Sequence, residues 1–159
     1  LNVVTALVIG LLTEQLAVVA VFTLSFMVLR SYTGGYHSDS RIFCYLGSNL
    51  VLLVPVYTQA VFYKTSLARL LAVLLVSAGI IFLLSPMHSK NRKLDKEEQK
   101  HFGRKARLIA VLELAVLGIL WHAGQIPYAY AVYTGICITA LFMIVGKAQL
   151  WIQSHTENG

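Results

Sequence analysis

Long apolar runs alternate with short polar breaks along this chain, and the pattern predicts an all-helical membrane protein. A helix needs about 20 apolar residues to cross the hydrocarbon core of a bilayer. Apolar residues are continuous within each run rather than alternating, which argues against the strands of a membrane barrel. In chain order the runs are Leu1–Leu12, Leu16–Leu29, Ile42–Tyr63, Leu67–Ser85, Leu108–His122 and Ile126–Gly146.

We therefore predict one domain over residues 1–159, a polytopic bundle of about six transmembrane helices. The chain begins at Leu1, without methionine and inside an apolar run, so we expect the first helix to be truncated and an N-terminal segment to be missing. Composition agrees with a bilayer environment, because 57% of residues are hydrophobic, only 13% are charged and the mean hydropathy is +0.70.

Basic residues give the bundle a predicted orientation. Eleven of the 13 Lys and Arg residues fall on one side of the alternating spans, and only Lys64 and Arg69 fall on the other. The richer side is expected to be cytoplasmic. Eight of these residues lie in a predicted cytoplasmic loop, residues 86–107. Topology thus explains the net charge of +6, and we expect a plasma-membrane protein with no nucleic-acid partner.

The polar segment at residues 30–44 is the candidate for chemistry, since it carries His37 and Cys44 between two apolar runs. Thiolate is the reactive form of cysteine, and a nearby histidine can take its proton. On one continuous helix, seven residues would separate the two by about 10 Å, too far for a hydrogen bond. The segment must therefore fold back at the cytoplasmic edge, and Gly34 and Gly35 provide the backbone freedom.

Three polar residues between the pair extend this candidate site. Ser38, Asp39 or Ser40 can cap a helix that begins there, which would put Cys44 in its first turns, where the helix dipole favours a thiolate. Asp39 is also a candidate to orient the His37 ring, and the serines are candidate oxyanion donors. The residues alone leave a plain alternative open, a solvated histidine and a cysteine that only packs. No metal-ligand spacing is present, so neither metal nor cofactor is expected.

The glycine, histidine and cysteine positions resemble the signature of a known family. With Tyr36 before the histidine, the pattern is Arg30-x3-Gly34-Gly35-x-His37-x6-Cys44. It is similar to that of the accessory gene regulator B (AgrB) family, membrane cysteine endopeptidases of peptide quorum sensing in Gram-positive bacteria. The helical layout is similar over the whole chain. A second stretch, residues 86–94, also resembles a family motif, although Lys93 stands where many members have proline.

The resemblance implies a mechanism and a partner. Cys44 would be the nucleophile and His37 the general base. The substrate would be an AgrD-like precursor peptide held on the bilayer by an amphipathic leader. Cleavage on the C-terminal side of the signal would leave an acyl-thioester on Cys44, which cyclisation would resolve to a thiolactone or lactone. Arg30 belongs to the motif, either as a lipid-facing anchor or as a ligand for a substrate carboxylate.

Two further groups are candidate substrate contacts. Lys96, Lys100, Arg104 and Lys105 could hold the charged tail of the precursor, although the positive-inside rule also explains them. Glu113 falls within a predicted span, where an ionisable residue is costly and often functional. A structural hydrogen bond and a substrate contact both remain open for it.

Two other functional classes compete with the endopeptidase hypothesis. One is a small peptide transporter or exporter, in which the glycine segment would be a re-entrant gate. The few charges within the predicted spans count against a transport path. The other is a non-catalytic membrane scaffold. The sequence also leaves open whether the protein is a homodimer.

Overall fold

The computed structural model describes residues 2–33, 41–86 and 96–156. These residues form helices joined by short turns, and no strand occurs among them, so the all-helical prediction is confirmed. The helices are α1 (Asn2–Leu12), α2 (Leu16–Thr33), α3 (Arg41–Tyr57), α4 (Gln59–Lys64), α5 (Leu67–Leu84), α6 (Lys96–His122) and α7 (Ile126–Thr156).

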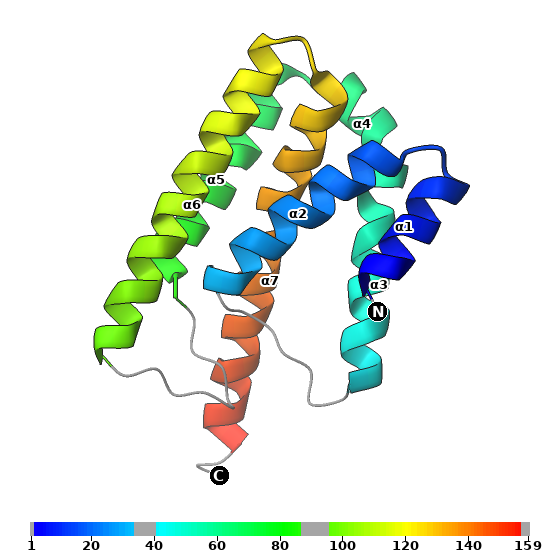
Figure 1. Ribbon diagram of the computed structural model, residues 1–159. Coiled ribbons are helices and arrows are strands. Elements are labelled where there is room, and N and C mark those ends of the chain that lie inside the picture. The colour runs from blue at the N-terminus through cyan, green and yellow to red at the C-terminus, as the bar shows by residue number, and fades with distance from the viewer. Residues whose placement is uncertain (1, 34–40, 87–95, 157–159) are drawn as a thin grey trace.

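Helix α7 is the centre of the bundle, because α2, α5 and α6 all pack against it, while α1 and α3 pack on α2 and on each other. The long helices alternate in direction (Figure 1). The α1–α2 turn, α4, the start of α5 and the α6–α7 turn lie at one end, here called the upper end. The C-terminal ends of α2 and α5 and the N-terminal ends of α3 and α6 lie toward the opposite, lower end.

Close approach of α2 and α7 depends on a glycine. A Cβ on Gly135 would stand 2.5 Å from the Ser25 hydroxyl oxygen and 3.1 Å from its Cβ, so a side chain here would force Ser25 to shift. Ala131 and Thr139, one turn away on each side of Gly135, are also buried. Small residues at this spacing let helix backbones approach closely inside a membrane. Tight packing of α2 on α7 therefore fixes the path of α2 toward the lower end.

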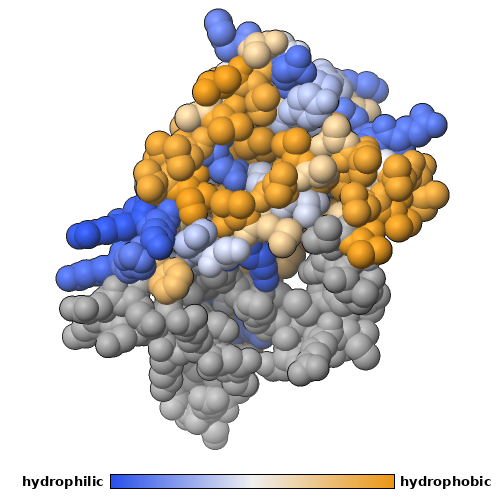
Figure 2. All heavy atoms as spheres, in the orientation of Figure 1, coloured by the Kyte–Doolittle hydropathy of each residue, from blue (hydrophilic) through white to orange (hydrophobic). Residues whose placement is uncertain are grey.

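Most of the described surface between the two ends is apolar. Large hydrophobic side chains such as Leu75, Leu83 and Ile119 are more than 60% exposed. In Figure 2 hydrophobic residues form a broad band across the described part of the molecule, with hydrophilic groups above it and at the lower left. In the described residues, α2, α5 and α7 are long and apolar enough to cross a membrane. These features are typical of a membrane protein. The count of about six spans stays a prediction.

One predicted helix is two helices in the structure. The sequence predicts a single helix over Ile42–Tyr63, but α3 ends before a bend at Thr58 and α4 follows it. The Tyr130 hydroxyl donates a hydrogen bond of 2.9 Å to the Pro55 carbonyl oxygen. In an uninterrupted helix that carbonyl would accept from the backbone N–H of Gln59. The Tyr130 side chain of α7 therefore replaces a backbone N–H as the donor to the Pro55 carbonyl oxygen, at the point where α3 ends.

The predicted basic loop is also shorter than expected. Residues 86–107 were expected to be a loop, but α6 begins at Lys96, so this prediction is wrong for residues 96–107. The segment is rich in Lys, Glu, Gln and Arg, which are good helix formers, and its polarity hid the helix from a search for apolar runs. In the same way α7 continues past the predicted end at Gly146 as far as Thr156.

Candidate active site at the lower end

The structure covers only part of the predicted catalytic segment. Gly34, Gly35, His37, Ser38, Asp39 and Ser40 lie outside the described residues. Cys44 belongs to α3 by its backbone, and its side chain lies outside the described set. The contact between His37 and Cys44, and the fold-back that it requires, therefore stay predictions.

The local backbone around Cys44 agrees with the helix start predicted from the sequence. Helix α3 begins at Arg41, so Cys44 is its fourth residue. The first backbone N–H groups of a helix have no partner within the helix and carry partial positive charge. A cysteine near such an N-terminus is more readily a thiolate, the form that acts as a nucleophile.

Arg30 lies near the C-terminal end of α2 and contacts two aromatic rings. Its guanidinium carbon is 4.7 Å from the centre of the Phe142 ring and 5.8 Å from that of Phe26. Phe142 belongs to α7, so this cation–π contact joins the end of α2 to the central helix. Arg30 thus ties the last turn of α2, which leads to the candidate catalytic segment, to α7. Its two roles left open by the sequence, at the lipid headgroups or toward a substrate carboxylate, stay predictions.

Helix α6 presents its basic residues to the outside. Lys100, Arg104 and Lys105 are exposed, and Lys96 is the first residue of α6, with a side chain outside the described set. Arg107 follows Lys100 and Arg104 along the same side of α6, and its Nε donates a hydrogen bond of 3.3 Å to the Phe82 carbonyl oxygen at the end of α5. That bond fixes α6 against α5 and leaves the other basic side chains directed to solvent.

Glu113 has a partner inside the bundle. The Ser25 hydroxyl donates a hydrogen bond to its carboxylate and so joins α2 to α6, next to the contact between Ser25 and Gly135. Glu113 lies six residues beyond Arg107, about 9 Å further from the lower end along α6. The structure therefore brings Glu113 to Ser25 and supplies a structural hydrogen bond, the first of the two roles considered for it.

Comparison with known proteins identifies the family. The sequence pattern of AgrB, Accessory gene regulator B, matches residues 1–145. The chain belongs to the accessory gene regulator B family. It is 26% identical over 121 residues to an accessory gene regulator protein B of Staphylococcus intermedius, a match that covers 76% of this chain and 62% of that protein. No solved structure was found to match. The family resemblance inferred from the residue pattern is thus confirmed.

The part of the chain that matches the AgrB family includes every candidate site residue. Arg30, His37, Cys44, the basic residues of α6 and Glu113 all fall within residues 1–145, whereas the last turns of α7 do not. Among the residues that the structure describes, no three His, Cys, Asp or Glu side chains gather as metal ligands would.

Sequence reasoning missed a polar and aromatic cluster at the upper end of this AgrB family member. The Tyr130 hydroxyl lies 2.6 Å from the Thr58 hydroxyl, in addition to its bond with Pro55. Phe62 packs on Tyr130 and on Tyr133 with ring centres 4.9 and 5.3 Å apart. Tyrosines near helix ends were the only available signal, and they are equally typical of interfacial anchors.

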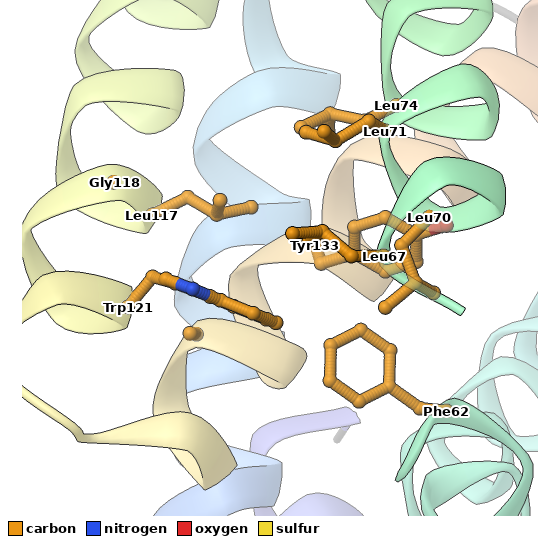
Figure 3. Close-up of a pocket in the computed structure, with 10 residues that line it drawn as sticks. Phe62, Leu67, Leu70, Leu71, Leu74, Leu117, Gly118, Trp121 and Tyr133 are labelled. Carbon is orange, nitrogen blue, oxygen red and sulfur yellow. The ribbon is translucent and has the colours of Figure 1, made fainter. Parts of the chain in front are cut away.

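Two cavities flank this cluster. One, of about 280 Å³, lies between α5, α6 and α7, and Figure 3 shows Trp121, Leu117 and Tyr133 around it. The other, of about 420 Å³, lies between α3, α4, α5 and α7 and is lined in part by Arg69 and Cys137. Neither cavity includes a residue of the candidate catalytic segment, so the upper end is a separate feature of the fold.

Proposed function

We propose that this chain is a membrane cysteine endopeptidase that processes a quorum-sensing precursor peptide of the AgrD type. Membership of the AgrB family supports a part in accessory gene regulator peptide processing. The observation that carries the endopeptidase assignment is Cys44 in the first turn of α3, in a family member that also has His37 behind two glycines. The assignment of the reaction rests on these two residue types and their proposed contact.

In the proposed reaction, His37 accepts the proton of the Cys44 thiol, and the Cys44 sulfur attacks the carbonyl carbon of the scissile peptide bond. The C–N bond then breaks, and His37 gives its proton to the departing amine of the C-terminal tail. The signal portion stays on Cys44 as a thioester. A thiol or hydroxyl of the precursor next attacks that thioester, closes the ring and returns Cys44 with its proton.

Ring closure competes with hydrolysis, so the thioester must be kept from water. One thioester replaces another when a thiolactone forms, and such an exchange is nearly balanced in free energy. An enclosed position at the membrane edge excludes water and favours the internal nucleophile. Ser38, Asp39 and Ser40 are proposed to supply the orienting group for His37 or an oxyanion donor.

The proposed topology has about six membrane spans, with the lower end in the cytoplasm. Helices α2, α5 and α7 meet the length and apolarity of a span, and α1, α3 with α4, and α6 run beside them in alternating directions. The C-terminal end of α2, with Arg30, and the N-terminal half of α6, with Lys100, Arg104 and Arg107, lie toward the lower end. Under the positive-inside rule this end is proposed to be cytoplasmic.

Cleavage of a co-expressed precursor tests the enzyme hypothesis against its rivals. Cys44→Ala should abolish release of the C-terminal tail, and His37→Ala should slow it about 100-fold or more. Cys137→Ala is the matched control and should remain active, because Cys137 lies within α7 beside Ser77 and Tyr133. A transporter or a scaffold would tolerate Cys44→Ala. Undiminished cleavage by that variant would therefore overturn the proposal.

A further inference from the structure

The cavity beside Arg69 has the form of a binding site for a chain-like apolar molecule. Helices α3 and α4 form one wall, α5 the other, and α7 the floor. Its volume of about 420 Å³ falls within the range of ligand pockets. Along the floor it extends from Tyr130 to Ile138, eight residues or about 12 Å of helix. Val54, Val61 and Val73 supply much of the walls.

The hydroxyl groups that line this cavity have hydrogen-bond acceptors inside the protein, and that of Tyr130 donates to the Pro55 carbonyl oxygen of α3. The hydroxyls of Thr58, Thr65 and Thr134 donate to backbone carbonyl oxygens one turn earlier, at 2.8, 2.7 and 2.8 Å. The hydroxyl protons of these threonines are therefore already used, and a ligand does not have to accept a hydrogen bond from them. The described walls are effectively apolar, so the cavity suits a hydrocarbon chain and not a polar solute.

Among the described residues, Arg69 is the charged residue that lines the cavity, and no acidic side chain lines it with Arg69. The guanidinium side chain is exposed and lies in the first turn of α5, at the upper end. Lys64, also exposed, ends α4 nearby in sequence. The cavity thus combines a cationic group at the upper end with an apolar extension toward the middle of the bundle.

We propose that this cavity binds an anionic phospholipid, with one acyl chain along α7 and the phosphate at Arg69. A free phosphate would leave the apolar walls unfilled. A peptide would bring backbone amides against walls that cannot pair with them, which is costly. The apolar band of the described surface is typical of contact with lipid, so the proposed ligand surrounds the protein in a bilayer. A guanidinium group binds a phosphate through charge-assisted hydrogen bonds. The site is separate from Cys44 and independent of the proposed reaction.

Native mass spectrometry of the purified full-length protein, with phosphatidylglycerol or phosphatidylcholine added, tests this site. The wild type should retain phosphatidylglycerol in preference to phosphatidylcholine. Arg69→Gln should weaken its retention about fivefold, to the level of phosphatidylcholine. Val73→Trp should fill the cavity and remove both lipids. Gly118→Leu is the matched control, because it fills the neighbouring cavity in Figure 3 and should bind as the wild type does.

Three outcomes would overturn the proposal: an unchanged lipid count in Val73→Trp, an unchanged preference in Arg69→Gln, or a retained peptide in place of lipid. If Val73→Trp fails to fold, Val61→Trp fills the same cavity from the opposite wall. The readout requires no precursor and no cleavage. A negative result in lipid binding would therefore not affect the proposed reaction, and a negative result in cleavage would not affect the proposed lipid site.

Discussion

Arg30 illustrates what a residue's neighbours add to its place in a motif. Its position at the end of an apolar run predicts a basic residue near the lipid headgroups, but not what that residue touches. The structure places its guanidinium over Phe142, which is remote in sequence and lies on α7. Sequence alone could not find this pair because nothing in an apolar run distinguishes the phenylalanine that faces inward.

A double-mutant cycle measures this contact. Arg30→Gln should lower the free energy of unfolding by about 1 kcal/mol, because the charge leaves the ring faces. Arg30→Lys should retain most of the free energy of unfolding that Arg30→Gln loses. Phe142→Leu should cost additional stability by itself, yet the loss from Arg30→Gln should shrink in the Phe142→Leu background. The measurement is thermal or denaturant unfolding of the purified protein in detergent. Fully additive losses would show that the two side chains do not interact.

Gly135 offers a second residue-scale test, through its contact with Ser25. Gly135→Ala should destabilise the protein by about 1–3 kcal/mol, because the new methyl group would overlap the Ser25 side chain. Adding Ser25→Gly should restore part of this loss, although it also removes the donor to Glu113. Gly118→Ala is the control, since nothing lies within 4 Å of its Cβ position, and helix propensity should make it neutral or slightly stabilising. A neutral Gly135→Ala would contradict the close packing of α2 on α7.

At the scale of elements, the apolar runs predicted which helices are present better than the residues at which those helices begin and end. Helix α5 was predicted within one residue, because Ser66 and Ser85 bound a continuous apolar run. The division of α3 from α4 was missed, since it depends on Tyr130 of another helix. The start of α6 was missed because charged residues carry no apolar signal. Boundaries at the end of an apolar run could be predicted, whereas those set by another helix or lying in a charged stretch could not.

The exposed basic face of α6 gives an element-scale prediction for the reaction. Replacing Lys96, Lys100, Arg104 and Lys105 with glutamine should raise the precursor concentration for half-maximal cleavage roughly fivefold, with the maximal rate largely kept. Added salt should reduce this difference in precursor concentration between variant and wild type, because Lys100, Arg104 and Lys105 are exposed. His101→Gln, on the same exposed stretch, is the matched control. An unchanged dependence on precursor concentration would remove α6 as a contact for the charged tail.

At the scale of the whole molecule, the helix ends alternate between the two ends of the bundle, as the apolar runs predict. The N-terminal ends of α3 and α6 lie toward the same end of the bundle, and the turn between α6 and α7 lies at the other. The sequence could predict this alternation because each apolar run reverses the direction of the chain. It could not predict the cavities, which arise where helices distant in sequence leave space between them.

Labelling of single cysteines tests the orientation predicted from the basic residues. In a background without Cys44 and Cys137, a cysteine at Gln125, in the α6–α7 turn, should react with a membrane-impermeant maleimide in intact cells. A cysteine at Lys100 should react only after the cells are permeabilised. Both positions are exposed, so burial does not explain a difference between them. The reverse pattern would put the lower end outside and contradict a cytoplasmic site.

The central claim is that Cys44 carries the acyl group of the precursor, and intact-protein mass spectrometry tests it most directly. The protein is co-expressed with a precursor whose cyclising residue is replaced by alanine, so that the thioester cannot be resolved by ring closure. The predicted result is an added mass equal to the precursor without its C-terminal tail, bound at Cys44, released by hydroxylamine and absent from Cys44→Ala. Folded protein of unchanged mass beside intact precursor, or an adduct that persists in Cys44→Ala, would contradict the account.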